Sequence, residues 1–362
     1  MMYERIDCRL CGGRVETVLK LADTPLANLF PDKPYVGEKY PLELKQCVGC
    51  GHVQVGHVVD DSVLFNADYK YETPEGLKPQ LQHRAKQLKE KYPSARIALE
   101  IGANNGLFMH ALRDAGFESV MGVDPSSSEW LIWKMPFDPQ CAELILRRVG
   151  MVDLIVANNV FAHIDDLRSV FDAIKDVLSP DGSLVFEVQY RVSMMGSGAF
   201  DMIYHEHRDY HALGPLALFL QSCGLVMTEY EIFDAHGGSI RVTAKKHGMQ
   251  VALPHEPCDW DAFRDHIDAT KQAMQFDRQL AAFGAPAKAT TLIYQLGLQG
   301  KIKHCVDDTP HKQGKYIAGT DIKVLGRHGM EAEMLLLAWN YEDLICKMFP
   351  ATDFIVPFKE VA

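Results

Sequence analysis

Short apolar runs alternate with amphipathic stretches through the middle of the chain. The runs have the length of buried strands and end at turn residues. Between them, apolar residues recur every three or four positions, which predicts helices. Predicted strands cover residues 97–101, 119–124, 152–160, 184–188, 226–233 and 236–242. Predicted helices cover residues 75–91, 107–115, 167–178 and 212–223, with a turn at 179–182. This alternation predicts a doubly wound parallel α/β sheet.

A second, shorter alternation follows. It consists of helices over 258–280 and 290–297 and strands over 301–306 and 334–338. Upstream of residue 75 the chain is instead rich in loops. Because 362 residues exceed one ordinary hydrophobic core, we expect three domains. They are a small N-terminal module (1–74), a central Rossmann-like domain (75–250) and a second Rossmann-like α/β domain (251–362).

Two Cys-x-x-Cys-Gly knuckles lie in the N-terminal module. They place four thiols at Cys8, Cys11, Cys47 and Cys50. Each pair has the spacing that binds one tetrahedral ion, and four sulfur ligands leave no open position for catalysis. The sequence therefore predicts a structural zinc site. A redox pair or two unrelated reduced pairs are the alternatives.

A glycine-rich turn follows the first strand of the central domain. Glu100 closes that strand, Gly102, Asn104 and Gly106 form the turn, and Asp124 ends the second strand. This order opens a nucleotide-binding βαβ unit, in which the second acid can bind a ribose. The turn lacks G-x-G-x-x-G and carries a carboxylate, which favours a cationic sulfonium over a pyrophosphate. S-adenosylmethionine (SAM) is therefore favoured over NAD. A tight turn without a cofactor is the alternative.

The residues with the strongest catalytic potential follow the next two strands. Asn158 and Asn159 end the strand over 152–160, at the sheet edge where such folds bind ligands. After the strand over 184–188, Tyr204, Glu206 and His207 bring together a phenol, a carboxylate and an imidazole, the group best suited to take a proton near neutral pH. His205 is interpreted as a packed histidine. A metal site is disfavoured, because successive residues of an extended chain point to opposite sides.

Two further groups have ambiguous patterns. Lys312 and Lys315, next to Tyr316, can bind a diphosphate or can belong to a solvated loop. Tyr69 and Tyr71 stand at alternate positions, as in an exposed strand.

Composition restricts the partners. The net charge of −11 argues against nucleic acid, and no apolar run reaches the ~20 residues that span a bilayer. The first residues, 1–5, lack the order of a signal peptide. We therefore expect a cytoplasmic protein with a small-molecule substrate and with no membrane or nucleic-acid partner. The oligomeric state stays open, and a monomer is compatible with the sequence.

Taken in order, these motifs resemble the SAM-dependent C-methyltransferases that act on nucleotide-linked 4-keto deoxysugars. The resemblance spans nearly the whole chain. It is carried by the two knuckles, Tyr69 and Tyr71, and residues 100–106, 122–126, 158–164, 204–207, 236–239, 312–316 and 338–341. It implies a zinc-binding module, a class I methyltransferase domain, and a C-terminal domain that contributes to nucleotide-sugar binding. It also implies methylation of a 4-keto-6-deoxysugar at carbon 3.

The resemblance also implies residue roles. His207 would take the proton from carbon 3, Tyr204 would hydrogen-bond the substrate or its enolate, and Glu206 would orient the histidine or a sugar hydroxyl. The implied SAM contacts are Glu100, Gly102, Asn104, Gly106, Asp124, Asn158 and Asn159. The implied substrate contacts are Tyr69, Tyr71, His163, Lys312, Lys315 and Tyr316.

The chain departs from the family pattern in three places. Asn105 replaces a usual aspartate, Ala318 replaces a usual proline, and the segment from Asp124 to Asn158 is shorter by roughly one or two helical turns. This shortening affects the adenine contacts expected from residues 135–138. The alternative functions are an O- or N-methyltransferase for another small acceptor and a cofactor-binding protein without turnover. A dehydrogenase is disfavoured, because residues 284–288 lack G-x-G-x-x-G.

Overall fold

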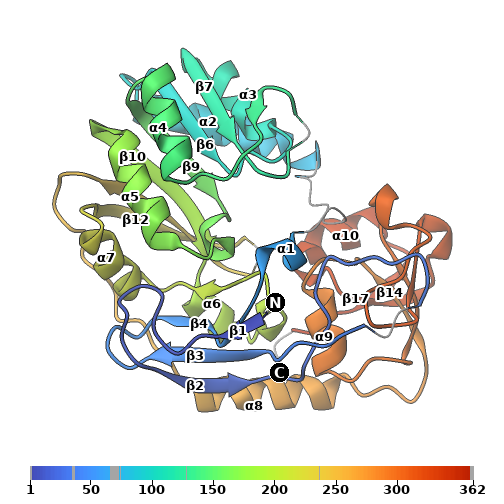
Figure 1. Cartoon of the computed structure of the whole chain (residues 1–362). Helices are drawn as coiled ribbons and strands as arrows, with labels where there is room; N and C mark the ends of the chain where they lie inside the picture. Colours follow the sequence, from blue (N-terminus) through green and yellow to red (C-terminus); the bar gives the residue numbers. More distant parts are fainter. Residues whose placement is uncertain are drawn as a thin grey trace.

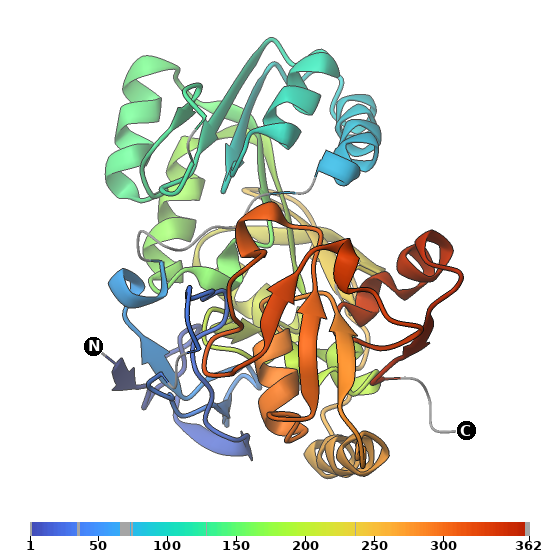
Figure 2. The same ribbon diagram turned by 90° about the vertical axis from the view of Figure 1, so that its right-hand side faces the viewer.

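The computed structural model describes residues 2–34, 37–65, 73, 75–127, 129–235 and 237–358. Figure 1 shows N-terminal strands in blue, a central sheet in cyan to yellow and a C-terminal sheet in orange to red. Figure 2 shows the N-terminal strands beside the C-terminal sheet, with the central sheet above both. The expected fold class, an α/β protein with a small N-terminal module and two Rossmann-like units, is confirmed. No helix in these ranges is long and apolar enough to cross a membrane.

A seven-stranded sheet forms the central part. In spatial order its strands are β12 (Val226–Phe233), β13 (Ser239–Lys245), β10 (Leu178–Gln189), β9 (Val152–Asn158), β6 (Ile97–Ile101), β7 (Ser119–Val123) and β8 (Ile132–Trp133). Only β13 runs antiparallel to its neighbours, β10 and β12; the other neighbouring pairs are parallel. The strand order reverses between β6 and β9. Their carboxyl ends therefore form the switch point at which open α/β sheets bind ligands.

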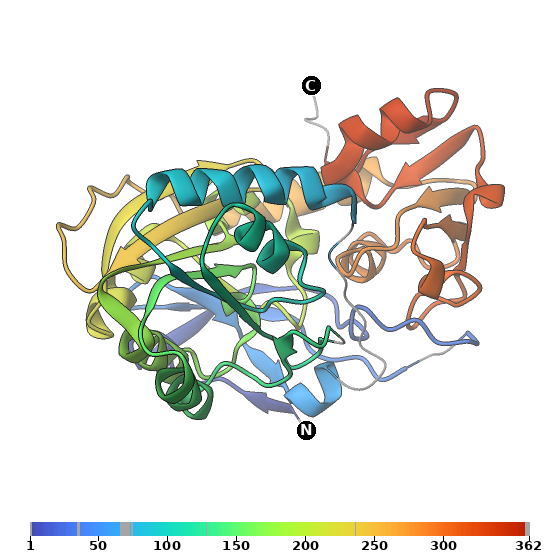
Figure 3. The same ribbon diagram turned by 90° about the horizontal axis from the view of Figure 1, so that it is seen from above.

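Helices cover both faces of this sheet. One face is covered by α2 (Lys78–Lys91), which follows the short 3₁₀ turn η1 (Glu75–Leu77), and by α3 (Leu107–Asp114). Figure 3 shows α2 lying across this face. The opposite face is covered by α4 (Pro139–Arg148), α5 (Leu167–Val177) and α7 (Leu213–Ser222). The helices α2, α4 and α5 each turn the apolar side to the sheet and the polar side to the solvent.

The N-terminal module is a small antiparallel sheet. It contains β2 (Val15–Lys20), β3 (Glu43–Cys47), β4 (Val53–Val55) and β11 (Asp209–Tyr210), while β1 (Met2–Glu4) pairs with β5 (His57–Val59), which precedes α1 (Asp61–Leu64). The strand β11 comes from the central part of the chain. The module is therefore completed by residues that directly follow the predicted catalytic segment.

The C-terminal unit is a wholly parallel five-stranded sheet. Its strands, in spatial order, are β16 (Lys323–Leu325), β15 (Ile302–Val306), β14 (Leu280–Phe283), β17 (Glu333–Leu336) and β18 (Asp353–Ile355). The helices of this part are α8 (Trp260–Ala273), α9 (Ala289–Gln295) and α10 (Glu342–Met348), with 3₁₀ turns η4 (Pro310–Lys312), η5 (Arg327–Gly329) and η6 (Trp339–Tyr341). The predicted second α/β unit is confirmed.

Three local predictions were wrong. The helix predicted over 258–280 ends at Ala273, and Leu280 starts the central strand β14 instead, because a short apolar run fits a buried strand as well as a helix. The turn predicted at 179–182 lies inside β10 as a register irregularity against β9. The strand predicted over 236–242 starts at Ser239. The helix α4 was not predicted at all.

One apolar cluster joins the three parts. It contains Leu44 and Val53 of the N-terminal sheet, Phe200 and Ile203 of the central part, and Leu292 of α9. All five side chains are fully buried. The segment that carries the predicted catalytic residues is therefore fixed from both sides by packing.

Candidate active site

The four knuckle cysteines form one compact cluster. Their sulfur atoms all lie within 4.8 Å of one another, and three of the separations are 3.5, 3.5 and 3.7 Å. Four ligands at the usual Zn–S distance of about 2.3 Å are about 3.8 Å apart in a tetrahedron. The backbone N–H of Cys50 points to the sulfur of Cys47 at 3.4 Å. The donor set and its geometry fit a closed zinc site, and the cysteine positions predicted from the knuckles come together.

The glycine-rich turn has a geometry that few other residues could adopt. Gly102 and Gly106 have φ angles of +73° and +78°, in the left-handed region. A Cβ atom on Gly102 would lie 2.4 Å from the side chain of Val160. The Asn104 N–H donates to Asp124 Oδ2 at 2.9 Å, and the Ser126 N–H donates to Oδ1 at 2.7 Å. Asp124 thus holds the turn beside the carboxyl ends of β6 and β7.

Buried acceptor atoms without partners gather beside this turn. Glu100 Oε2 and Asn158 Oδ1 make no hydrogen bond within the described residues. Glu100 lies on β6 and Asn158 on the neighbouring strand β9, on the same face of the sheet by register. Burial raises the pKa of the Glu100 carboxyl well above its ordinary value, while the Met109 N–H and the Arg84 charge lower it and the Asp124 charge raises it further. These unpartnered oxygens fit the ammonium group of SAM.

The structure also describes Asn159, a predicted SAM contact, and two of the residues expected near adenine, Phe137 and Asp138. Asn159 has a positive φ of 55°, and its N–H donates to the Glu187 carbonyl at 2.8 Å, while its side chain is exposed. Of the residues expected near adenine, Phe137 is buried in the core and Asp138 caps α4 by accepting from the Cys141 N–H at 2.8 Å. These last two residues therefore have structural functions.

If Glu100, a predicted SAM contact, binds the ammonium group of SAM, we expect the SAM affinity to depend on pH. Without cofactor, burial raises the pKa of this carboxyl, so it holds its proton to a higher pH than an ordinary glutamate does. A bound cation favours the carboxylate, so SAM binding releases a proton and the affinity rises with pH up to that raised pKa. Calorimetry in two buffers of different ionisation enthalpy measures this release. Glu100→Gln should abolish it, and a wild-type affinity that is independent of pH would contradict the assignment.

His207 occupies a defined position in the predicted catalytic segment. Its side chain is only 8% exposed. His207 Nδ1 lies 3.1 Å from the Met202 carbonyl oxygen, which can only accept, so Nδ1 carries the hydrogen. In the neutral imidazole Nε2 then has the lone pair, and the Tyr204 hydroxyl, 2.6 Å away, donates to it. The two rings are 4.0 Å apart between centroids. The structure thus presents an imidazole in the tautomer that a general base requires.

The neighbouring residues of this segment contact different parts of the chain. His163 Nδ1 donates to the Glu206 carbonyl at 2.8 Å, and its ring lies 5.0 Å from that of His207. Burial lowers the pKa of His163 to about 4, so this imidazole is neutral. The Glu206 carboxyl contacts Asn28 at 3.4 Å rather than His207, and burial raises its pKa to about 7. His205 points away to the Pro41 carbonyl at 3.3 Å, as a packed histidine.

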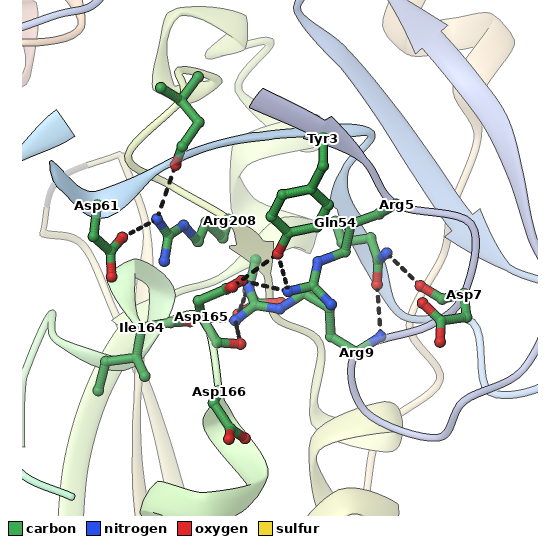
Figure 4. A network of polar contacts seen from close by, with 12 residues as sticks. Tyr3, Arg5, Asp7, Arg9, Gln54, Asp61, Ile164, Asp165, Asp166 and Arg208 are labelled. Atoms are coloured by element: carbon green, nitrogen blue, oxygen red, sulfur yellow. Dashed lines mark hydrogen bonds and ion pairs between the residues drawn. The ribbon is translucent and has the colours of Figure 1, made fainter. Parts of the chain in front are cut away.

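A polar network connects the zinc module to this segment (Figure 4). Arg9, which lies between Cys8 and Cys11, donates to Asp209 Oδ2 at 2.7 Å and to the backbone carbonyls of Ile164 and Asp165. Both members of the Arg9–Asp209 pair are buried, and His52 contacts the second oxygen of Asp209 at 2.7 Å. Asp209 follows His207 by two residues, and Ile164 follows His163. Hydrogen bonds of Arg9 thus link the first zinc knuckle directly to the two segments that carry His163 and His207.

The C-terminal unit holds the same segment from the other side. Trp339 Nε1 donates to Asp201 Oδ2 at 2.7 Å, and Thr291 Oγ1 donates to the Ile203 carbonyl at 2.8 Å. Lys288 lies 3.7 Å from Asp201 and 3.4 Å from the centre of the Trp339 ring. Burial lowers the pKa of Lys288 to about 8. The sequence alone did not predict these contacts, because they join residues far apart in the chain.

The predicted diphosphate residues make contacts with the C-terminal unit and the N-terminal module. Lys312 donates to the Ala285 carbonyl at 2.9 Å and lies 3.8 Å from Asp307, at the carboxyl ends of β14 and β15. Lys315 is half-buried, and the Tyr316 N–H donates to the Pro31 carbonyl at 2.9 Å. Tyr69 and Tyr71 lie outside the described residues.

Comparisons with known proteins agree with the division of the chain into an N-terminal module, a central part and a C-terminal unit. Three family models match successive stretches: a zinc binding domain over residues 8–65, a methyltransferase domain over 73–230 and a C-methyltransferase C-terminal domain over 261–354. The chain is therefore a SAM-dependent methyltransferase with a zinc-binding module.

A curated relative shows which kind of methyltransferase the chain is. C-methyltransferase NovU from Streptomyces niveus is 30% identical over 404 residues, which cover 98% of this chain and 96% of that protein. The chain belongs to this family of SAM-dependent C-methyltransferases. Because the alignment is longer than the 362 residues of this chain, the relative contains residues without a counterpart here.

Solved methyltransferases match about half of the chain. Mitomycin 7-O-methyltransferase MmcR is 16% identical with a TM-score of 0.33, over 46% of this chain and 54% of that one. Magnesium protoporphyrin IX methyltransferase from Synechocystis PCC 6803 is 13% identical with a TM-score of 0.35, over 48% of this chain and 89% of that one.

Proposed function

We propose that the chain methylates carbon 3 of a nucleotide-linked 4-keto-6-deoxysugar. The observation that carries this proposal is the His207 imidazole, which is buried, fixed in one tautomer and paired through Nε2 with the Tyr204 hydroxyl. A saturated carbon next to a ketone becomes a nucleophile by losing a proton, because the ketone oxygen takes the negative charge of the enolate. The reaction therefore needs a base and a hydrogen-bond donor together.

His207 and Tyr204 divide these two tasks. His207 Nε2 takes the proton from carbon 3, and the electron pair of the broken C–H bond forms the enolate. A hydroxyl hydrogen rotates freely, so Tyr204 can turn its O–H from Nε2 toward the keto oxygen as negative charge develops there. SAM, when bound, supplies an electrophilic methyl group to the enolate carbon. His207 then loses its proton to solvent, which returns the base to its starting state.

Neighbouring residues would position the sugar. His163 presents a neutral imidazole beside His207. Within the described residues, the Glu206 carboxyl contacts Asn28 and makes no hydrogen bond to the His207 ring, so we assign this carboxyl to a sugar hydroxyl. Lys312 and Lys315 would take the diphosphate, with Tyr316, Tyr69 and Tyr71 as further substrate contacts. The domain bounds 1–74, 75–250 and 251–362 stay a prediction.

A substrate panel tests the proposal. The protein is incubated with SAM and with dTDP- and GDP-linked 4-keto-6-deoxysugars, and the products are analysed by mass spectrometry and NMR. The proposal expects one added methyl group bonded to carbon 3, stable to mild hydrolysis. A methyl group on oxygen or nitrogen, or no transfer to any 4-keto sugar while other acceptors react, would contradict it.

A further inference from the structure

Arg84 on the helix α2 is a buried cation that the reaction described above does not use. Its side chain is 11% exposed, and its guanidinium lies 5.6 Å from the centre of the Phe108 ring in the first turn of α3. Arg84 Nη1 forms an ion pair with Glu187 at the carboxyl end of β10. The guanidinium thus lies above the sheet edge beside the glycine-rich turn.

Two nitrogens of this guanidinium have no partner. Nε and Nη2 of Arg84 are buried and make no hydrogen bond within the described ranges. These two atoms share one edge of the planar group, where their N–H bonds run nearly parallel. Such an edge binds both oxygens of a carboxylate at once. A buried donor pair without an acceptor is unfavourable, so this edge is suited to a ligand that supplies one.

Unpartnered acceptors lie on the same face of the sheet. Glu100 on β6, Asn158 on β9 and Glu187 on β10 occupy three successive strands, and the pairing register places them on the α2 side. Glu100 Oε2 and Asn158 Oδ1 are unpartnered, as described above. Arg84 is near enough to influence Glu100 electrostatically, yet no ion pair joins the two within the described residues. The site therefore has unused donors and unused acceptors close together.

A zwitterionic amino acid supplies the missing partners of both kinds. Its carboxylate accepts two hydrogen bonds, and its ammonium donates up to three. SAM, the methyl donor of the family to which the chain belongs, carries such a group at its amino-acid end. We infer that the Nε–Nη2 edge of Arg84 binds the carboxylate of SAM, while Glu100 and Asn158 bind its ammonium. The inference rests on SAM dependence and is independent of the proposed sugar substrate.

The test compares two ligands that differ in the carboxylate alone. Decarboxylated SAM keeps the adenosine, the sulfonium and the amine. Affinities for SAM and for decarboxylated SAM are measured by calorimetry on the full chain and on Arg84→Gln. We expect the variant to bind SAM about 10- to 100-fold more weakly, as for loss of a charge-assisted pair, and to bind decarboxylated SAM as the wild type does. Equal weakening for both ligands, or unchanged SAM affinity, would overturn the inference.

Two further variants separate binding from support of the fold. Arg241 on β13 donates to the same Glu187 oxygen but is a quarter exposed, so Arg241→Gln should change the two affinities equally or not at all. Arg84→Lys keeps the charge without the two-donor edge. Should Arg84→Gln fail to fold, Arg84→Lys replaces it, and the preference for SAM over decarboxylated SAM should fall in that variant. An undiminished preference in Arg84→Lys would contradict bidentate binding.

Discussion

Replacing His207 by asparagine lowers the rate of methyl transfer by about 10²- to 10⁴-fold, the usual effect of losing a general base, while the Kd for SAM stays unchanged. Asparagine is the sharpest substitution, because its side-chain N–H can still donate to the Met202 carbonyl as Nδ1 does. What disappears is Nε2, the atom that accepts from Tyr204. Single-turnover kinetics with a saturating sugar substrate measure the rate, and calorimetry measures the SAM affinity.

His205→Gln is the matched control for this variant. His205 is a buried histidine two residues before His207, and its Nε2 contacts the Pro41 carbonyl at 3.3 Å. Glutamine can keep that donor, so the control should retain most of the turnover. If His207→Asn and His205→Gln slow the reaction equally, the effect comes from packing of the segment, and the base must be sought elsewhere.

Removing zinc abolishes methyl transfer although no cysteine lies among the catalytic residues. Structural zinc sites contribute apparent binding free energies of about 10–16 kcal/mol to folding. Here the knuckle also carries Arg9, whose buried ion pair with Asp209 fixes the chain two residues beyond His207. Leaving one member of such a buried pair unpaired costs about 3–5 kcal/mol. Loss of the ion therefore releases the segment that positions the base.

Cys11→Ser and a chelator-treated wild type provide the measurement. Zinc content is determined by elemental analysis alongside turnover, SAM affinity and thermal stability. We expect turnover and zinc to be lost together, while SAM binding, which we assign to the central sheet, falls much less. Cys346→Ser in α10 is the control, because this half-buried thiol is outside the cluster. A zinc-free protein with full turnover would show that the module is not required for the site.

Short-range patterns predicted much of the fold and part of the site. The spacing within each knuckle predicted the zinc-binding thiols. The order of strand, turn and helix predicted the position of the glycine-rich turn next to Asp124. The apolar run at Leu280 shows the limit, since its assignment as a strand depends on neighbours β15 and β17 that lie later in the chain. Periodicity alone cannot supply that information.

The contacts that position the site were not accessible from the sequence. Arg9 meets Asp209 across 200 residues, and Trp339 meets Asp201 across 138. Each of these side chains is an ordinary polar or aromatic residue in its local sequence. Arg84 belongs to a helix whose many polar residues are typical of a solvated surface, and only the folded chain buries its guanidinium. Tertiary packing, not local spacing, gives these residues their roles.

We propose that His207 generates a carbon nucleophile. The most direct measurement is hydrogen exchange at carbon 3, followed by NMR, when a 4-keto sugar substrate is incubated with the protein in deuterated water. S-adenosylhomocysteine replaces SAM in this experiment, so that no methyl group can be transferred. We predict exchange with the wild type and with His205→Gln, and none above background with His207→Asn. Absence of exchange with a sugar that the wild type methylates, or equal exchange with His207→Asn, would contradict the claim.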